Sequence, residues 1–227
     1  MQFAKKSFDI GLFSNQPAAQ LDFWQQTVGL PFDHTLKLGG GLLQHRHAVG
    51  EAILKLNAAR DPLPHPGSNN LQAVILGLPG LSGERLLHDP DGNLIEIHPS
   101  DTPTLGIRIA TPDLKASASF YHHVLGLQRL AENLLACGNS QLQLQPGGQS
   151  AGANDNTLPA LGLRYLTLQV EDCDAAWQAA IAAGARSARD PVTLGSTARI
   201  AFVIAPEGTW VELSERASLT GREPGVH

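Results

Sequence analysis

The sequence predicts an α+β protein with two tandem domains, each built from two modules of strand, helix and three further strands. Two internal repeats are the basis of this prediction. The stretch Phe23–Leu30 (FWQQTVGL) returns as Phe120–Leu127 (FYHHVLGL). A tight turn followed by an apolar strand, Asp89–His98 (DPDGNLIEIH), returns in weaker form as Ala205–Leu213 (APEGTWVEL). Self-similarity at long spacing indicates duplicated domains.

Three of the modules begin with a recognisable strand and helix. The predicted pairs are 8–13 with 17–28, 105–110 with 113–125, and 163–170 with 174–183. The strands alternate apolar and polar residues, whereas the helices carry one apolar stripe. Pro17 suits the first turn of a helix, and Gly29 and Gly126 suit the left-handed residue that follows a helix end.

Short strands complete the modules. They are expected at about 33–38, 42–49 and 51–57, then at 71–76, 84–88 and 94–98, then at 128–132, 134–137 and 141–145, and finally at 211–214. The second module is short, because the interval from Gln72 to Glu96 is about half of that from Tyr165 to Glu212. We therefore expect this module to lack a helix. The predicted domains are 1–100 and 104–216, followed by a C-terminal tail at 217–227.

Composition narrows the classes of function. With 227 residues, 42% of them hydrophobic and 16% charged, the chain is typical of a globular protein rather than a disordered one. A net charge of −5 and the lack of a basic stripe argue against a nucleic-acid partner. Neither a signal peptide nor a membrane span is predicted, so we expect a cytoplasmic protein. Cys137 and Cys173 are too few and too far apart for a disulfide framework or a zinc ribbon.

Both repeated strands place a carboxylate in their middle. Since side chains alternate between the faces of a strand, Ile95 and Ile97 are expected in a core, with Glu96 on the opposite face. The same alternation puts Trp210 and Glu212 on one face of the last strand. These carboxylates are either solvent-facing strand residues or groups that bind a ligand in a cup formed by the sheet.

The helix ending in Phe-Tyr-x-x-Val-Leu-Gly-Leu and the motif Asp-Pro-Asp-Gly-Asn-x-Ile-Glu-Ile resemble those of the vicinal oxygen chelate superfamily. This superfamily includes glyoxalase I, bleomycin-resistance proteins and extradiol ring-cleaving dioxygenases. The resemblance covers nearly the whole chain and implies that paired modules curl their mixed sheets into two cups. Two tandem double-module domains are most similar to the arrangement in the ring-cleaving dioxygenases.

The resemblance also implies positions for metal ligands, on the first and last strands of the modules. In the first half these positions hold Asp9, Gln72 and Glu96, which could bind one divalent ion (Mn, Fe, Zn or Ni) and leave positions open for two substrate oxygens. Lys55 argues against a metal, since its charge would repel the ion and could instead pair with Glu96 or Asp9. The protein is therefore expected to hold one divalent metal or none.

Histidines are candidates for proton transfer. His88 precedes the turn and His98 shares a strand face with Glu96, so either is a candidate catalytic acid or base near neutral pH. His45 and His47 lie on one face of a predicted strand, as either a metal-binding pair or an exposed face.

The second half departs from the metal pattern, because Gly106 supplies no donor and Tyr165 is an uncommon ligand. Its predicted cup face is polar with an aromatic wall, which suits an organic ligand better than a metal. The expected substrate-binding residues are Arg108, Gln143, Tyr165, Trp210 and Glu212.

Two functions remain open at this point. The first is a metal-dependent lyase, isomerase or ring-cleaving dioxygenase that chelates vicinal oxygens of a small substrate. The alternative is a metal-free protein of the bleomycin-resistance type that binds or sequesters a small molecule. Because related proteins often assemble modules across chains, we also expect a homodimer.

Overall fold

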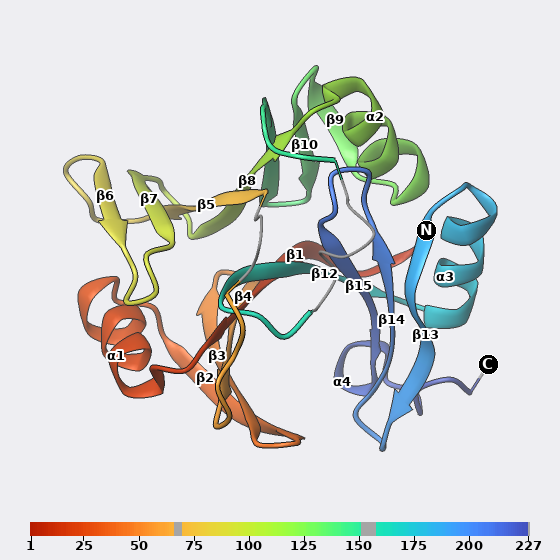
Figure 1. The fold of residues 1–227 in the computed structure, drawn as a ribbon, viewed down its shortest axis with the longest axis horizontal. Helices are drawn as coiled ribbons and strands as arrows, with labels where there is room; N and C mark the ends of the chain where they lie inside the picture. Colours follow the sequence, from red (N-terminus) through yellow and green to blue (C-terminus); the bar gives the residue numbers. More distant parts are fainter. Residues whose placement is uncertain (66–69, 151–157, 227) are drawn as a thin grey trace.

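The computed structural model describes residues 1–65, 70–150 and 158–226 (Figure 1). The first module contains β1 (Phe3–Ser14), α1 (Pro17–Asp22), a π-helical turn η1 (Phe23–Thr27), β2 (Phe32–Gly39), β3 (Leu42–Val49) and β4 (Ala52–Ala59). The second contains β5 (Leu71–Leu78), β6 (Arg85–His88) and β7 (Leu94–Pro99). The third contains β8 (Thr104–Thr111), α2 (Leu114–Ser119), η2 (Phe120–Val124), β9 (Gln128–Ala131), β10 (Leu134–Cys137) and β11 (Ser140–Pro146). The fourth contains β12 (Gly162–Val170), α3 (Cys173–Ala182), β13 (Arg186–Leu194), β14 (Ala198–Ile204) and β15 (Trp210–Arg216), and α4 (Ala217–Thr220) follows it.

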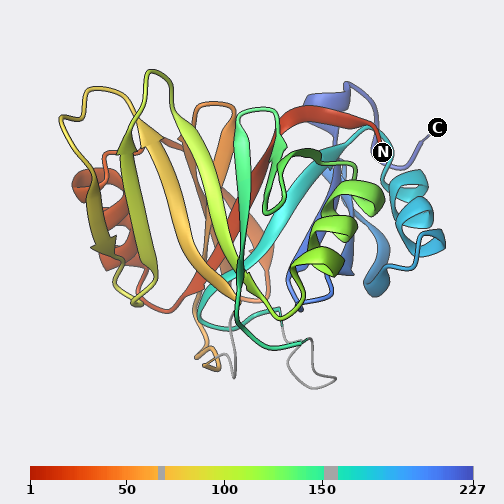
Figure 2. The same cartoon turned by 90° about the horizontal axis from the view of Figure 1, so that it is seen from above.

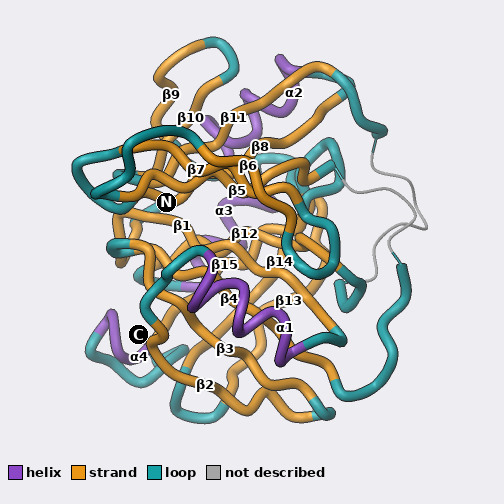
Figure 3. The backbone as a smooth tube through the Cα atoms, turned by 90° about the vertical axis from the view of Figure 1, so that its left-hand side faces the viewer, coloured by secondary structure: helices purple, strands orange, loops and turns teal. Residues whose placement is uncertain are grey.

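The strands form two mixed sheets, which confirms the α+β prediction. The eight-stranded sheet has the order β13-β14-β15-β12-β1-β4-β3-β2, and the seven-stranded sheet has the order β6-β7-β5-β8-β11-β10-β9. The eight-stranded sheet curls into a half-barrel, and the second view shows the seven-stranded sheet in front of it (Figure 2). Strands dominate the tube drawing, with short helices set on the sheets (Figure 3).

The modules combine differently from the tandem arrangement expected for 1–100 and 104–216. The first and fourth modules share the eight-stranded sheet through antiparallel pairing of β1 with β12, which sets Asp9 opposite Thr167 and Gly11 opposite Tyr165. The second and third modules share the seven-stranded sheet through antiparallel pairing of β5 with β8. Alternation along a strand identifies the buried face but not the neighbouring strand, so the sequence pattern fits both arrangements.

One hydrophobic core lies between the sheets. In β1 the side chains of Phe8, Ile10 and Leu12 are fully buried in this core, and Val74 of β5 and Ile107 of β8 contribute from the other sheet. The alternation of β1 therefore turns Asp9, Gly11 and Phe13 to the concave face of the eight-stranded sheet. That face carries the larger cavity described below.

Side-chain caps begin two of the helices. Asp113 accepts a hydrogen bond from the backbone N–H of Ala116, and Asp172 accepts one from that of Ala175, at 2.9 and 2.8 Å. Such caps satisfy N–H groups that have no partner within the helix. In the described residues, none of the helices has both the length and the apolar character needed to cross a membrane.

The duplicated turns hold the helices of the neighbouring module. Gln20 of α1 donates to Asp91 in the second module's turn at 2.8 Å. In the other half, Ser117 and Tyr121 donate to the buried carboxylate of Glu207 at 2.7 and 2.6 Å. Burial and the adjacent carboxylate raise the pKa of Tyr121 well above its usual value. The acidic residue of each turn thus fixes a helix that comes from another module.

The second module passes from β5 to β6 through a turn, with no helix in residues 70–99. The tail after β15 begins with α4 and continues to Val226, and the predicted tail's last residue, His227, lies outside the described residues.

Candidate functional site

A cavity of about 870 Å³ occupies the concave face of the eight-stranded sheet. Phe13 of β1, Tyr165 of β12, Phe202 of β14 and Trp210 of β15 form an aromatic wall along it. The ring centroids of Tyr165 and Phe202 lie 6.1 Å apart, and those of Phe202 and Trp210 lie 5.5 Å apart. The rings meet edge to face, which is a favourable geometry for aromatic contacts.

Gly11 makes room for the Tyr165 ring. A Cβ atom on Gly11 would lie 2.0 Å from a carbon of that ring, a distance that no side chain tolerates. Asn57 and Gln44 donate hydrogen bonds to the Tyr165 hydroxyl at 3.1 and 3.4 Å. Burial, followed by the negative charge of Glu212, raises the pKa of Tyr165 well above its usual value. Tyr165 therefore remains a neutral phenol in the cavity wall.

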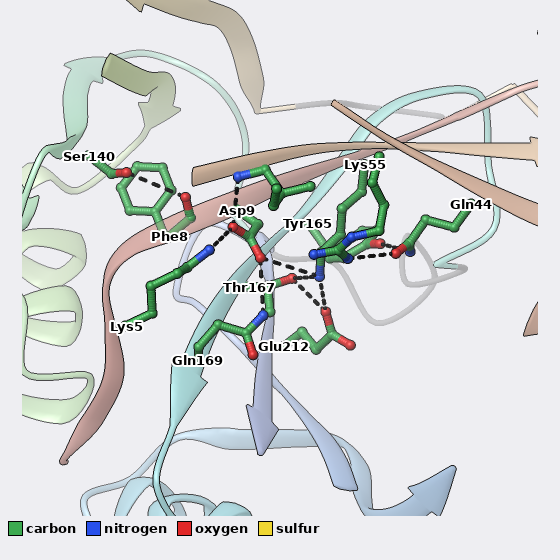
Figure 4. A network of polar contacts seen from close by, with 12 residues as sticks. Lys5, Phe8, Asp9, Gln44, Lys55, Ser140, Tyr165, Thr167, Gln169 and Glu212 are labelled. Carbon is green, nitrogen blue, oxygen red and sulfur yellow. Dashed lines mark hydrogen bonds and ion pairs between the residues drawn. The ribbon is translucent and has the colours of Figure 1, made fainter. Parts of the chain in front are cut away.

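Lys55 lies at the centre of a buried polar network on the cavity floor (Figure 4). Its ammonium nitrogen donates to the Thr167 hydroxyl at 2.6 Å and to Glu212 Oε2 at 2.9 Å, and lies 3.9 Å from Asp9 Oδ2. The ammonium also faces the Tyr165 ring, 5.5 Å from its centroid. Burial lowers the pKa of Lys55, while the charges of Glu212 and Asp9 oppose this shift.

Asp9 of β1 belongs to the same network and links β1 to β12 through Gln169. It is fully buried and forms an ion pair with Lys5. It also accepts hydrogen bonds from the Ile53 N–H at 2.9 Å and from the Gln169 side chain at 3.1 Å. Burial acts to raise the pKa of Asp9, but Lys5 and Lys55 outweigh it and hold that pKa below its usual value. These partners leave Asp9 as an ionised structural group.

The three predicted metal ligands do not meet. Asp9 belongs to β1 in the eight-stranded sheet, whereas Glu96 belongs to β7 in the seven-stranded sheet. Gln72 is exposed at an irregularity in the pairing of β5 with β8. The prediction grouped these residues because it paired modules in sequence order, and the observed pairing of the first module with the fourth separates them.

A metal also does not fit the donors that the larger cavity brings together. Glu212 lines this cavity and Asp9 belongs to the same buried network, but the ammonium of Lys55 bonds to Glu212 at 2.9 Å and lies 3.9 Å from Asp9. A divalent ion would have to displace a buried cation that already neutralises these carboxylates. In residues 1–65, 70–150 and 158–226, no group of three His, Cys, Asp or Glu side chains is arranged to hold a metal ion.

The seven-stranded sheet has a smaller concave cavity of about 420 Å³. Here Arg108 forms a two-pronged ion pair with Glu96, with Nη2 at 2.7 Å from Oε2, and its Nε donates to Gln143 at 3.2 Å. The two oxygens of Glu96 are thus engaged by a guanidinium. Gly106 lines the same cavity and supplies no side-chain donor.

The predicted substrate-binding residues therefore divide between two cavities. Arg108 and Gln143 lie in the smaller one, whereas Tyr165, Trp210 and Glu212 lie in the larger one.

The two predicted catalytic histidines lie away from the larger cavity. His98 lines the smaller cavity and pairs with Glu84 at 3.3 Å, and His88 is exposed in β6. His45 and His47 do share a strand face, but His47 is fully buried there and lies 5.8 Å from the Phe32 ring. Burial, followed by the charge of His45, lowers the pKa of His47 to about 4.

Several residues of the larger cavity were not among the predicted site residues. Gln44 in β3 and Asn57 in β4 line it, as do Phe202 in β14 and Arg216 at the end of β15. A signal was present for Asn57, which lies between the apolar residues Leu56 and Ala58 and so points to one face of its strand, whereas Gln44 lies in a run of polar residues that gives no such pattern. Among the described lining residues, the charged side chains are Lys37, Lys55, Arg189, Arg216 and Glu212.

Comparison with known proteins places part of the sequence in a family. Residues 105–213 match the sequence model of the Glyoxalase/Bleomycin resistance protein/Dioxygenase superfamily. No match to a curated protein was found.

Solved structures share the fold along most of the chain. Glyoxalase I from Zea mays is 15% identical, with a TM-score of 0.74 and coverage of 94% of this chain and 92% of that one. A putative dioxygenase from Bacillus subtilis is 14% identical, with a TM-score of 0.65 and coverage of 95% and 85%. The cppA protein from Streptococcus pneumoniae is 12% identical, with a TM-score of 0.56 and coverage of 95% and 100%. At these identities the likeness concerns the fold alone. The matched motifs identify residues 105–213 as a member of the Glyoxalase/Bleomycin resistance protein/Dioxygenase superfamily, and the chain as a whole shares the fold of these solved structures.

Proposed function

We propose that this protein binds a small organic anion with a flat apolar body in its larger cavity, and that it does so without a metal. The observation that carries the proposal is the lining of that cavity. Aromatic rings form one wall, and among the described lining residues four cationic side chains accompany one carboxylate, Glu212, which is already paired with Lys55. The lining is therefore cationic although the chain as a whole carries a net charge of −5.

The aromatic wall supplies both area and one directional contact. The Nε1–H of Trp210 is buried and has no hydrogen-bond partner among the described residues. A buried donor of this kind costs free energy unless a ligand or water accepts from it. An acceptor on the ligand would satisfy this N–H, while the flat body packs on Tyr165 and Phe202.

The metal-dependent lyase, isomerase or dioxygenase that the family resemblance implied receives no support from the donor set. Lys55 neutralises Glu212, the carboxylate of the larger cavity, and Arg108 engages Glu96, the carboxylate of the smaller one. We therefore assign no reaction step to a metal. The expected homodimer stays a prediction, which light scattering at working concentration would test.

Tryptophan fluorescence tests the proposal directly. We expect 2-naphthoate to quench the emission of the wild-type protein, and a chelator such as EDTA to leave this quenching unchanged. Trp210→Phe is expected to remove most of the change, because Trp24 is buried in the core and Trp177 lies on α3 outside the cavity. Trp177→Phe is the matched control and should quench like the wild type.

The opposite results would contradict the proposal. Quenching that survives in Trp210→Phe would place the probe elsewhere, and quenching abolished by the chelator would show that a metal takes part in binding. A panel of aromatic carboxylates that leaves the emission unchanged up to millimolar concentration would also count against it.

A further inference from the structure

We propose that Arg46 and Arg216 form a binding site for a carboxylate or phosphate group, in a second chamber that adjoins the larger cavity. This inference rests on the proposed function and names the charged end of the ligand. The second chamber has a volume of about 490 Å³, and its lining shares Thr197 and Arg216 with that of the larger cavity. The Arg216 side chain thus borders both spaces.

Arg46 is a buried cation with incomplete pairing. It projects from β3, is only 5% exposed, and lines the second chamber. Its Nη1 donates to Gln44 at 3.0 Å, but its Nε has no hydrogen-bond partner among the described residues. The nearest carboxylate oxygen, in Asp33, lies 3.9 Å from this Nε, and the Asp33 side chain is 42% exposed.

Arg216 is the second incompletely paired cation. It ends β15, two pleats beyond Glu212 on the same strand face, and its Nε is buried with no hydrogen-bond partner in residues 1–65, 70–150 or 158–226. Burial, followed by the charge of Arg46, lowers the pKa of Arg216, whereas Glu212 and Asp9 oppose this shift. Two guanidinium groups therefore repel one another across this part of the cup.

The remaining charges of the second chamber do not satisfy this pair. Its other titratable lining residues are Lys5, Asp33, His34 and Glu51. Lys5 forms an ion pair with Asp9. Asp33 and Glu51 are exposed, so that water screens their charge. An anion between Arg46 and Arg216 would replace repulsion by charge-assisted hydrogen bonds.

Together the two chambers define an elongated ligand. Its anionic end would lie between Arg46 and Arg216, and its flat apolar body would lie along Tyr165, Phe202 and Trp210. Guanidinium groups recognise carboxylate and phosphate alike through paired N–H donors, so the choice between these two groups is left to experiment.

Titration calorimetry with inorganic phosphate and with acetate, at constant ionic strength in chloride, tests the site without an apolar body. We expect the wild-type protein to bind at least one of them, and the stronger of the two identifies the group. Arg216→Met and Arg46→Met should each weaken this binding about tenfold or more, since each removes a charged hydrogen-bond donor. The control Arg129→Met removes an exposed arginine of β9 in the other sheet and should stay within about twofold of the wild type.

A conservative variant keeps the inference testable if the methionine variants fail to fold. Arg216→Lys keeps the charge but loses the planar pair of donors, and we expect it to bind the anion several-fold more weakly than the wild type. Wild-type protein that binds neither anion, or variants at Arg46 and Arg216 that bind as tightly as Arg129→Met, would overturn the inference.

Paired naphthalene probes separate this inference from the proposed function. If 2-naphthoate and the uncharged 2-naphthamide quench Trp210 with equal affinity, the anion site is refuted and the apolar cavity stands. If phosphate or acetate binds in an Arg216-dependent way but neither naphthalene probe changes the emission, the anion site stands and the proposed function fails. At least tenfold preference for 2-naphthoate, lost in Arg216→Met, supports both.

Discussion

Replacing Lys55 by methionine should destabilise the protein strongly, because it removes the cation from a buried network while its carboxylates remain. The lysine side chain is 2% exposed, and its ammonium lies 2.9 Å from Glu212 and 3.9 Å from Asp9. Asp9 retains Lys5, Gln169 and a backbone N–H, so most of the loss arises at Glu212. Breaking one partner of a buried ion pair typically costs 3–5 kcal/mol. Because Glu212 faces a cavity that water can enter, we expect the lower end, about 3 kcal/mol.

Chemical and thermal unfolding at pH 7 measure this loss. For a chain of this length, about 3 kcal/mol corresponds to a decrease of roughly 6–12 °C in Tm. The double variant Lys55→Met with Glu212→Gln removes both charges and should recover most of the lost free energy of unfolding. Lys37→Met, which removes an exposed lysine at the same cavity, should change the free energy of unfolding by less than about 0.5 kcal/mol.

The reasoning would be refuted by a Lys55→Met protein as stable as Lys37→Met. It would also be refuted if Glu212→Gln made the Lys55→Met protein less stable still, since the unpaired carboxylate would then not be the source of the loss.

Three further predictions follow from other contacts. His47 is buried and neutral, with a pKa of about 4, so the unfolded chain binds more protons than the folded protein between pH 6.5 and 4, and the free energy of unfolding decreases as the pH is lowered through this range. In urea unfolding, His47→Gln should reduce the loss of stability between pH 7 and pH 5 by about 2 kcal/mol. An unchanged pH dependence in this variant would count against the assignment. Gly11→Ala should clash with the Tyr165 ring, lower the free energy of unfolding by about 1–3 kcal/mol and weaken 2-naphthoate binding. Gly83→Ala, whose new Cβ meets no atom within 4 Å, should do neither, and equal behaviour of the two variants would contradict the assigned clash. Glu207→Ala should leave the Tyr121 and Ser117 hydroxyls without their acceptor and cost about 2–4 kcal/mol, and full stability of the variant in urea would show that these bonds contribute nothing.

The secondary structure could largely be predicted, because it follows from local periodicity and turn chemistry. The helix boundaries show the limit of this approach. A single helix was predicted over 17–28, but α1 ends at Asp22 and a π-helical turn follows, in which the Val28 N–H bonds to the Phe23 carbonyl at 2.9 Å. Periodicity over one or two turns does not distinguish these two hydrogen-bond patterns.

The site could be predicted only in part, because its residues come from modules at opposite ends of the chain. Alternation correctly turned Trp210 and Glu212 to one face of the last strand, and Lys55 was recognised as an obstacle to a metal. The sequence did not distinguish Glu212, the actual partner of Lys55, from Glu96. That choice depends on whether β1 pairs with β12 or with β5. Strand pairing over such a distance leaves no mark in local sequence.

The joining of the first module to the fourth has a consequence for how the chain acquires its shape during synthesis. The seven-stranded sheet uses only residues 71–146, so the middle of the chain can pair its strands as soon as it has left the ribosome. The half-barrel forms later, because β1 can pair with β12 only after the residues from 162 onward have been synthesised. During that interval one side of β1 is an unpaired edge, open to pairing with other chains. Contacts between such distant segments also slow folding. The chain therefore completes its larger cavity last, and a protein truncated before β12 would lack this cavity while keeping every strand of the other sheet.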